Sequence, residues 1–388
     1  MTSASDAAPG SPHGRTDGPL RIAMISYYLP SESKIGVGYQ VHALANELVL
    51  RGHRVDVFSP CAPVDGARYG HVHVPLGGSL RTFRFAVEMR RRDLSSYDVL
   101  HAHGEDYWMW RRRVPSHVRT LHGSCFEEAL RIRGVKERLR MVLLGFTEVL
   151  ASLVADRTVL ISSQTRRWTP WVRTVIPNGV DANLFGRRLP KTDHPTVLFV
   201  GTWQGRKRGA ELADAFARDV RAVHPDAELR MVTQDAPPVV PEGVTVLGRL
   251  SDDELADEYG RAWLFCLPSS YEGFGIPYAE AMTAGLPVVA TFNVGARYVT
   301  GEGASGVLVE LPALGGALAE LLSDGEERER LSRASMTRAE SFDLRRVADS
   351  YEEVYRSGLR RADRRGRRRR KPRDDVSVGR DRPRPTRS

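Results

Sequence analysis

The chain has 388 residues, enough for two domains, and carries 57 Lys or Arg against 48 Asp or Glu, a formal net charge of +9. Residues 360–388 contribute 14 basic and 4 acidic residues, which leaves 43 against 44, or −1, for the rest. Charge therefore gives no sign of a specific nucleic-acid-binding protein. We expect a soluble cytoplasmic protein, because no run approaches the roughly 18 to 20 apolar residues of a membrane-spanning helix, the opening residues lack the apolar segment of a signal peptide, and three cysteines are scattered.

Residues 1–19 are polar and expected to be disordered, whereas residues 20–177 are predicted to form an α/β domain. An apolar segment leads into a glycine-containing loop at 31–38, after which apolar residues recur at helical spacing as far as Gly52. This succession is typical of a parallel sheet with covering helices. The predicted strands of this domain cover residues 20–30, 53–58, 98–103, 118–123 and 158–162.

Residues 178–340 are predicted to form a second α/β domain, because the succession of strands and helices begins again at residue 195. Its predicted strands cover residues 195–201, 228–233, 244–248, 262–268, 287–291 and 306–310. Ser251 and Glu254 have the spacing of a capping box, which predicts a helix start. Two Rossmann-like halves in tandem are expected to hold a ligand between them, at the carboxyl ends of their strands.

The chain is expected to end in an amphipathic helix at 341–359 and a disordered basic tail at 360–388, which has almost no apolar residue. A tail of this kind can make weak contacts with RNA or with an anionic membrane surface. We favour the alternative, a solvated tail without a specific partner.

The segment EGFGIPYAE places Glu272 and Glu280 eight positions apart, with two glycines and a proline between them. A buried strand is predicted just before it, and Pro277 suits the first position of a helix. Glu272 should therefore lie in a strand-to-helix loop and Glu280 in the helix. The glycines allow a ligand to approach the backbone, and the helix start attracts an anion such as phosphate. Two acids at such a place suit the hydroxyls of sugars rather than the phosphates.

A basic loop, with Arg206, Lys207 and Arg208, follows the first predicted strand of the second domain. A solvated charge run is the alternative interpretation. Because the loop also opens a helix, we favour a site at which these cations and the helix dipole neutralise a diphosphate.

The sequence resembles the retaining glycosyltransferases of the GT-B class, family 4, over residues 20 to about 358. The most specific element is the E-x7-E signature at Glu272 and Glu280. Weaker elements are the glycine loop that begins at residue 35, the LHG at 121–123, the IPNGVD at 176–181 and the closing FDLRRVADSYEEVY at 342–355.

The resemblance implies a GT-B fold of two Rossmann-like domains facing across a cleft, with the acceptor in the first and a nucleotide sugar in the second. It implies that Glu280 binds the ribose, that Glu272 binds a hydroxyl of the donor sugar, and that His122 lies beside the transferred sugar. The other implied donor contacts are Lys207 and Arg208 as the diphosphate clamp with Arg206 beside them, Gly36 and Gly38 admitting the diphosphate, Arg249 and Leu250 at the base, and the backbone of Phe274, Gly275 and Ile276 against sugar and phosphates.

The sequence departs from the family in two places: Thr202 follows Gly201 where many members have arginine, and NVGARYV replaces the more usual glycine-glycine-x-x-glutamate. The first departure leaves open which cation of the basic loop faces the phosphates. The resemblance implies transfer in which the leaving phosphate takes the proton of the acceptor, without an enzymatic nucleophile. Consistently, no Asp-x-Asp metal motif lies near the loops, so we expect no cofactor and no metal, with UDP a commoner carrier than GDP.

The acceptor is the least determined partner. Glu105 and Asp106 follow a predicted strand of the first domain and could face a cationic small molecule such as an aminocyclitol, as in antibiotic biosynthesis, against the alternative of surface acids. Residues 136–146 mix basic and apolar side chains, which suits a lipid or glycan acceptor at a membrane surface. A nucleotide-sugar epimerase and a nucleotide-sugar-binding protein without catalysis are the further alternatives.

Overall fold

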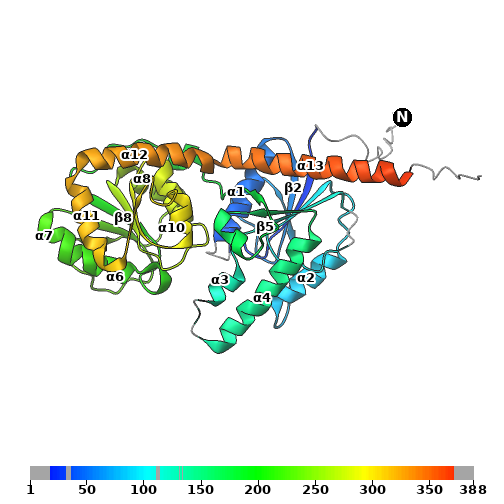
Figure 1. The fold of residues 1–388 in the computed structure, drawn as a ribbon, viewed down its shortest axis with the longest axis horizontal. Helices are drawn as coiled ribbons and strands as arrows, with labels where there is room; N and C mark the ends of the chain where they lie inside the picture. The colour runs from blue at the N-terminus through cyan, green and yellow to red at the C-terminus, as the bar shows by residue number, and fades with distance from the viewer. Residues whose placement is uncertain (1–17, 32–35, 111–113, 131, 133, 371–388) are drawn as a thin grey trace, which may run out of the picture.

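The structure, a computed structural model, describes residues 18–31, 36–110, 114–130, 132 and 134–370, with side chains as far as residue 364. The chain forms two α/β domains that lie side by side (Figure 1). The first has a seven-stranded sheet of order β3-β2-β1-β4-β5-β6-β7, and the second a six-stranded sheet of order β10-β9-β8-β11-β12-β13. Neighbouring strands pair in parallel in both sheets, as the sequence predicts.

The first domain begins at β1 and places its helices on both faces of the sheet. Its elements are β1 (Arg21–Ile25), α1 (Gly36–Leu50), β2 (Arg54–Ser59), β3 (Gly70–His73), α2 (Arg81–Arg91), β4 (Val99–Ala102), β5 (Ser116–Leu121), α3 (Cys125–Ala129), α4 (Val135–Val154), β6 (Arg157–Leu160), η1 (Ser163–Arg167) and β7 (Thr174–Val175). Helix α1 buries Val41, Leu44 and Leu48, and Gly52 follows it at a φ of 87°, so the predicted apolar stripe and stop are confirmed.

The second domain begins after the crossing near residue 180. Its elements are α5 (Ala182–Phe185), β8 (Thr196–Val200), η2 (Gly205–Lys207), α6 (Gly209–Ala215), η3 (Phe216–Val220), α7 (Arg221–Val223), β9 (Glu228–Val232), β10 (Val244–Val246), α8 (Asp252–Arg261), β11 (Leu264–Leu267), α9 (Ile276–Thr283), β12 (Val288–Thr291), α10 (Val294–Val299), β13 (Val307–Val309), η4 (Leu311–Ala313), α11 (Leu314–Ser323), α12 (Gly325–Ala339) and η5 (Glu340–Phe342). Ser251 and Glu254 make both hydrogen bonds of the predicted capping box at the start of α8.

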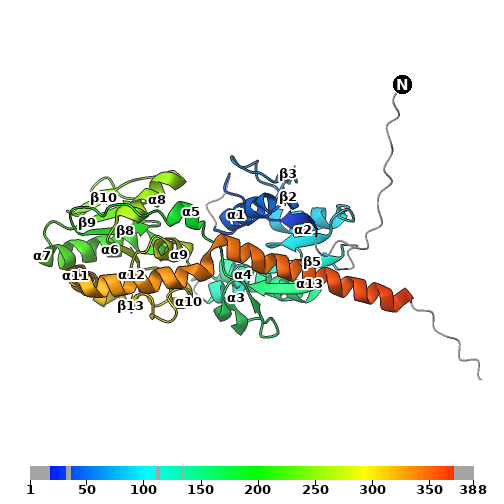
Figure 2. The same ribbon diagram turned by 90° about the horizontal axis from the view of Figure 1, so that it is seen from above.

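The last helix, α13 (Leu344–Arg370), returns from the second domain and packs on the first (Figure 2). Tyr351 and Tyr355 belong to the same buried cluster as the strands β1 and β2. The helix continues past residue 359, so the expectation of disorder was wrong for 360–370. The two buried tyrosines anchor the helix on the first domain, and arginine, which has a high helix propensity, allows it to continue. The rest of the predicted tail, and most of 1–19, lie outside the described residues.

Within the described part of the chain, no helix is both long enough and apolar enough to cross a membrane.

Candidate active site

The loop that carries Glu272 lies between β11 and α9, at the carboxyl edge of the second sheet, as predicted. It is tied to the basic loop by backbone contacts. The Ser270 N–H donates to the Arg206 carbonyl at 2.8 Å, and the Arg206 guanidinium donates to the Tyr271 carbonyl at 2.7 Å. The two loops therefore form one unit, although 64 residues separate them in the chain.

The Glu272 carboxylate is buried and receives three donors on its Oε1 atom. Lys207 Nζ lies at 2.7 Å, Arg206 Nη1 at 2.9 Å and Ser269 Oγ at 2.5 Å. Burial alone would raise the pKa of Glu272, but the charges of Lys207 and Arg206 outweigh it and lower the pKa below its ordinary value. Burial in turn lowers the pKa of Lys207. Glu272 is therefore a carboxylate that organises the basic loop.

Glu280 lies one turn inside α9 and is partly buried. The Tyr259 hydroxyl donates to its Oε2 atom at 3.0 Å. Burial raises the pKa of Glu280 to about 7, with the charge of Asp252 adding to the effect and the Tyr259 bond opposing it. The pKa values of the two glutamates are therefore shifted in opposite directions, because Lys207 and Arg206 contact Glu272 whereas no ion pair to Glu280 occurs among the described residues.

Glycines shape the turn between the two glutamates. Gly275 has a φ of 89°, and a Cβ there would lie 2.3 Å from the Tyr278 ring. A Cβ on Gly295 would lie 2.5 Å from the Phe274 carbonyl oxygen, and the Gly295 N–H donates to the Glu272 carbonyl at 2.9 Å. A side chain at either position would displace the loop, so both glycines are required by the geometry of the turn.

The first domain meets this loop across the cleft. A Cβ on Gly273 would lie 3.2 Å from the His122 carbonyl oxygen, and one on Gly36 would lie 3.0 Å from Ile276 Cδ1. His122 follows β5, and Gly36 begins α1. The structure therefore brings His122, the glycine loop and the E-x7-E segment together, as the resemblance implies.

His122 is held by a second buried histidine. His103 Nδ1 lies 2.9 Å from His122 Nε2, with the two rings stacked. His103 in turn packs on His101, at a ring distance of 4.1 Å, and His101 Nδ1 lies 2.7 Å from the Tyr355 hydroxyl of α13. Burial lowers the pKa of His122 to about 3, so its ring is neutral near pH 7 and can bond a sugar hydroxyl without carrying charge.

The acceptor residues that the sequence suggested do not lie together. Asp106 is fully buried and forms ion pairs with His117 and Arg119, so the expectation that it faces an acceptor was wrong. Glu105 has a left-handed backbone, with a φ of 53°, and is less buried than Asp106. Burial raises the pKa of Glu105 to about 7, with Glu148 adding to the shift and Arg119 opposing it.

Four of the donor-site residues named from the resemblance lie in contrasting surroundings. Arg208, between η2 and α6, is partly exposed and has a left-handed backbone with a φ of 57°. Arg249 is exposed and Leu250 partly exposed, in the loop before α8. Gly38 is buried, and a Cβ there would lie 2.9 Å from the Leu29 backbone. Gly38 therefore serves the packing of α1 against Leu29, and its assignment to the diphosphate stays a prediction.

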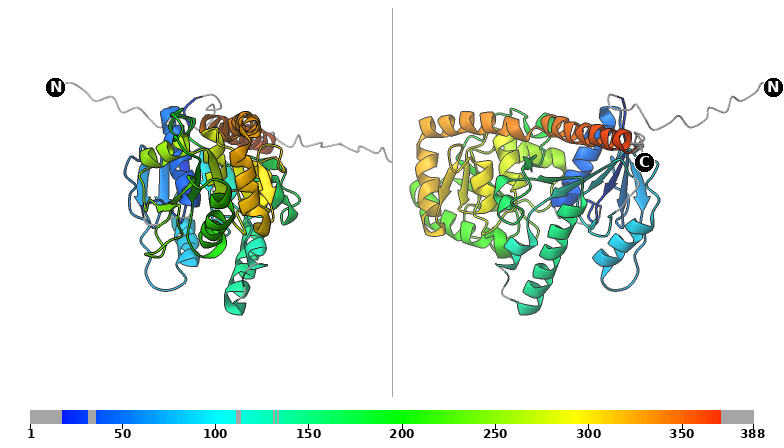
Figure 3. Two further views of the ribbon diagram at one scale, coloured as in Figure 1. Left: turned by 90° about the vertical axis from the view of Figure 1, so that its left-hand side faces the viewer. Right: turned by 45° about the vertical axis from the view of Figure 1, so that its right-hand side comes forward.

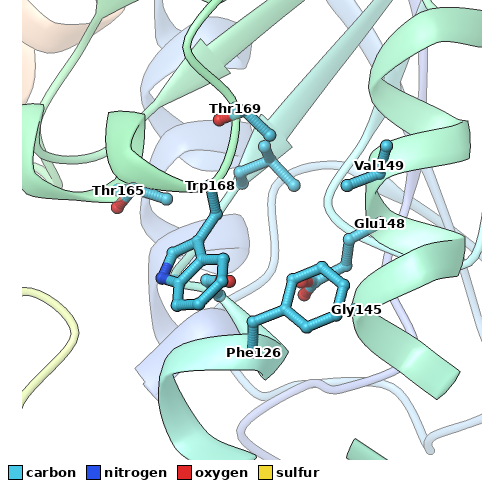
Figure 4. A pocket seen from close by; sticks show the side chains of 10 residues that line it. Phe126, Gly145, Glu148, Val149, Thr165, Trp168 and Thr169 are labelled. Atoms are coloured by element: carbon cyan, nitrogen blue, oxygen red, sulfur yellow. The ribbon is translucent and has the colours of Figure 1, made fainter. Parts of the chain in front are cut away.

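A pocket lies beside His122, between α3, α4 and η1 (Figure 4). Phe126, Glu148 and Trp168 point into it, and Gly123 is also one of its lining residues. The Phe126 and Trp168 rings stack at 5.2 Å, and Glu148 Oε2 accepts from the Cys125 N–H at 2.9 Å. The pocket is therefore mostly apolar, with one buried acid. It was not predicted, because its wall is made by segments 40 residues apart.

No group of three or more His, Cys, Asp or Glu side chains with the arrangement of a metal site occurs among the residues that the structure describes. The expectation that transfer needs no metal stays a prediction.

Comparison with known proteins identifies the family. Residues 35–184 match the model for Glycosyltransferase Family 4, and residues 181–338 match the model for Glycosyl transferases group 1. The chain belongs to the group 1, family 4 glycosyltransferases. The E-x7-E segment lies within the second match, and the glycine loop and His122 lie within the first.

Relatives cover almost the whole folded part of this glycosyltransferase. It is 29% identical to the phosphatidyl-myo-inositol mannosyltransferase of Mycobacterium tuberculosis, over 87% of this chain and 96% of that protein. It is 28% identical to the D-inositol 3-phosphate glycosyltransferase of Geodermatophilus obscurus, over 87% and 89%. Relatives of this kind identify a sugar-transferring enzyme.

Solved structures identify the fold as GT-B. The sucrose-phosphate synthase of Thermosynechococcus elongatus matches with a TM-score of 0.70 at 21% identity, over 87% of this chain and 98% of that one. The HepE protein of Anabaena, solved with UDP and glucose, matches with a TM-score of 0.67 at 18% identity, over 87% and 100%. The predicted fold class is therefore confirmed.

Sequence reasoning missed several residues that build the site. Ser269 and Gly295 contact Glu272 directly, and Asn293 donates to the Ser269 carbonyl at 3.0 Å while capping α10. His103 holds His122. An Asn-x-Gly just after a strand and the His-x-His at the end of β4 were visible in the sequence, but neither has a fixed meaning without the fold.

Proposed function

We propose that this enzyme transfers a hexose from a nucleotide diphosphate sugar, more commonly of UDP than of GDP, to an acceptor hydroxyl with retention of configuration. The observation that carries the proposal is the buried Glu272, bound to Lys207 and Arg206 and facing the His122 loop across the cleft. A sugar diphosphate fits this place, because it presents hydroxyls to the acid and phosphates to the cations. Arg208, at the start of α6, would add a further cation.

In the proposed reaction the acceptor oxygen forms a bond to the anomeric carbon while the bond from that carbon to the phosphate oxygen breaks. The bonding electrons leave with the nucleoside diphosphate, and its phosphate oxygen takes the proton of the acceptor hydroxyl. Lys207 and Arg208 stabilise the charge that develops on the diphosphate. His122, neutral and fixed by His103, binds a sugar hydroxyl and positions the anomeric carbon. No metal takes part in this scheme.

A cationic small acceptor, such as an aminocyclitol, now depends on Glu105 alone. Its pKa of about 7 means that a nearby cation would favour the charged carboxylate and so contribute binding energy. Glu105→Gln should then raise the acceptor Michaelis constant and leave that of the donor unchanged. An unchanged acceptor constant would remove the remaining support for this acceptor class.

A lipid-borne acceptor is the second candidate, favoured by the apolar pocket beside Gly123. The space there is only about 10 Å³, so the stacked Phe126 and Trp168 rings would have to move apart to contact part of an aliphatic chain. Trp168→Ala should impair transfer to an acceptor with an alkyl chain more than transfer to its water-soluble head group. Equal effects on both would argue against an apolar part of the acceptor in this pocket.

The donor is tested by thermal shift with a panel of nucleotides and nucleotide sugars, because a ligand that binds the folded state raises the melting temperature. Glu280→Ala should weaken binding of the free nucleotide and of the nucleotide sugar alike. Glu272→Ala, which also frees Lys207 and Arg206, should weaken binding of the nucleotide sugar relative to that of the free nucleotide. An exposed acid, Glu310, provides the control as Glu310→Ala. Retention is tested by nuclear magnetic resonance of the product, and an inverted anomeric centre would refute the mechanism.

A further inference from the structure

Helix α4 has an exposed apolar face along its whole length. The face consists of Val135, Leu139, Leu143, Phe146, Leu150 and Leu153, whose exposed fractions run from 40% for Leu150 to 79% for Val135. At about 100° per residue these six positions fall within an arc of roughly 80°. We call this set the α4 stripe. A continuous row of large exposed apolar side chains is unusual on a soluble monomer and marks an interaction surface.

The α4 stripe points away from the domain that carries it. The opposite side of the helix is the packed one, where Met141, Gly145 and Ala151 are buried. Gly145 receives the Phe126 ring, which a Cβ at 145 would meet at 2.8 Å. Figures 1 and 3 show α4 projecting from the body of the first domain, with its amino-terminal end farthest from the sheet. The core of this domain therefore leaves the stripe uncovered.

Positive charge flanks the stripe on both sides. By the same helical geometry Lys136 lies just past one edge of the arc, Arg140 lies beyond it, and Arg138 lies on the other side. Glu137 lies on the side away from the stripe and pairs with Arg140, and Glu148 is turned inward onto Cys125. An apolar row with basic flanks matches the boundary between the acyl chains and the anionic head groups of a bilayer.

Helix α2 adds exposed cations on the same side of the molecule. It projects beside α4 from the first domain (Figures 1 and 3). Its exposed arginines include Arg81, Arg90 and Arg91, and Leu80 before it is exposed by 70%. The charge around the stripe is therefore unfavourable for a second copy of this chain, whose own cations would face these ones, but favourable for an anionic lipid surface.

We propose that the α4 stripe docks this glycosyltransferase on the surface of a bilayer that contains anionic lipid. The helix would lie in the interface with its apolar side chains among the upper acyl segments and its cations at the head groups. Docking would also bring the membrane close to the pocket beside Gly123, because the ring centroids of Phe146, in the stripe, and Phe126, in the pocket lining, lie 5.3 Å apart. For the acceptor this inference rests on the lipid-borne candidate, but docking itself is measured without sugar transfer.

The test is co-sedimentation of the full chain with vesicles of phosphatidylcholine alone and of phosphatidylcholine with phosphatidylglycerol, at low and high salt. Leu139→Gln with Leu143→Gln removes the middle of the stripe and keeps residues of high helix propensity. Leu50→Gln with Val239→Gln is the matched control, since both side chains are exposed, by 62% and 83%, away from α4. Circular dichroism verifies that each variant is folded.

The wild type and the control should bind the anionic vesicles, and the stripe variant should bind at least about tenfold more weakly. High salt should weaken wild-type binding without abolishing it, because the apolar part is insensitive to screening. Docking through the stripe is overturned by equal binding of the stripe variant and the wild type, by no binding of either, or by complete loss in high salt. It is also overturned if light scattering shows that the wild type and the control are dimers and that the stripe variant is a monomer.

Discussion

Glu280 should make this enzyme less stable at alkaline pH, and its replacement should reveal by how much. Burial raises its pKa from an ordinary value of 4.5 to about 7. A difference of this size corresponds to about 3 kcal/mol between the charged and the neutral carboxyl. In the folded protein Glu280 keeps its proton up to about pH 7, whereas in the unfolded chain it loses the proton near pH 4.5. Its contribution to stability is therefore complete below pH 4.5 and is lost as the pH rises through 7.

Glu280→Gln carries no charge at any pH and keeps an oxygen that can accept from Tyr259. The free energy of unfolding of the variant, relative to that of the wild type, should therefore rise by up to about 3 kcal/mol between pH 5 and pH 8. This corresponds to roughly 6 to 12 °C in melting temperature for a domain of this size. The same variant should bind UDP more weakly, because ribose hydroxyls donate better to a carboxylate. Wild-type UDP binding should release a proton near pH 7, which calorimetry in two buffers with different ionisation enthalpies detects.

The assay is thermal unfolding of wild type, Glu280→Gln and the exposed control Glu310→Gln at pH 5, 6, 7 and 8, with and without UDP. A difference in melting temperature between Glu280→Gln and the wild type that is the same at every pH would reflect packing alone. The reasoning is refuted if the offset is the same at pH 5 and pH 8, or if the control shows the same pH dependence.

Three further substitutions test the site. His103→Phe should lower kcat by about tenfold or more with little effect on the donor Michaelis constant, because it removes the hydrogen bond that fixes the His122 ring. His103→Gln should restore part of the rate. Steady-state kinetics measure both variants, and an unchanged kcat in both would contradict a positioning role for His103. Gly295→Ala should lower the free energy of unfolding by about 1 to 3 kcal/mol and weaken donor binding, because its methyl group meets the backbone at Phe274. The control is Gly316→Ala on α11, where a Cβ has open space. In urea unfolding this control should be neutral or stabilising. Asp106→Asn should lower the free energy of unfolding by about 3 to 5 kcal/mol, because it leaves the buried Arg119 without its charged partner, and the acceptor Michaelis constant should not change. A stable variant with impaired acceptor binding would restore the hypothesis that Asp106 faces the acceptor.

The sequence predicted the features that depend on short stretches of chain. The order of strands and helices, the capping box at Ser251 and the loop position of Glu272 follow from local periodicity, glycine and proline. The family signature added the arrangement of the cleft. The local patterns and the family signature agree because each local preference favours the same fold.

The sequence could not show contacts between distant loops or the direction of single side chains. Glu105 and Asp106 looked equivalent in the sequence, but Asp106 is fully buried in an ion pair with Arg119, thirteen residues on, whereas Glu105 is only partly buried. The pairing of Lys207 with Glu272 depends equally on two loops that only the fold brings together.

The crossings between the domains have a mechanical consequence. The chain passes between them at Val180 and again at Asp343, and the two passages run side by side, with the Val180 N–H donating to the Phe342 carbonyl at 2.7 Å and the Leu344 N–H donating to the Val180 carbonyl at 3.0 Å. Gly179 permits this, since a Cβ there would lie 3.0 Å from the Leu344 Cα atom. Two chain segments joined by hydrogen bonds can bend together but resist twisting relative to each other. Any opening of the cleft should thus follow one axis, and Glu272 would return to His122 along the same arc after every product release.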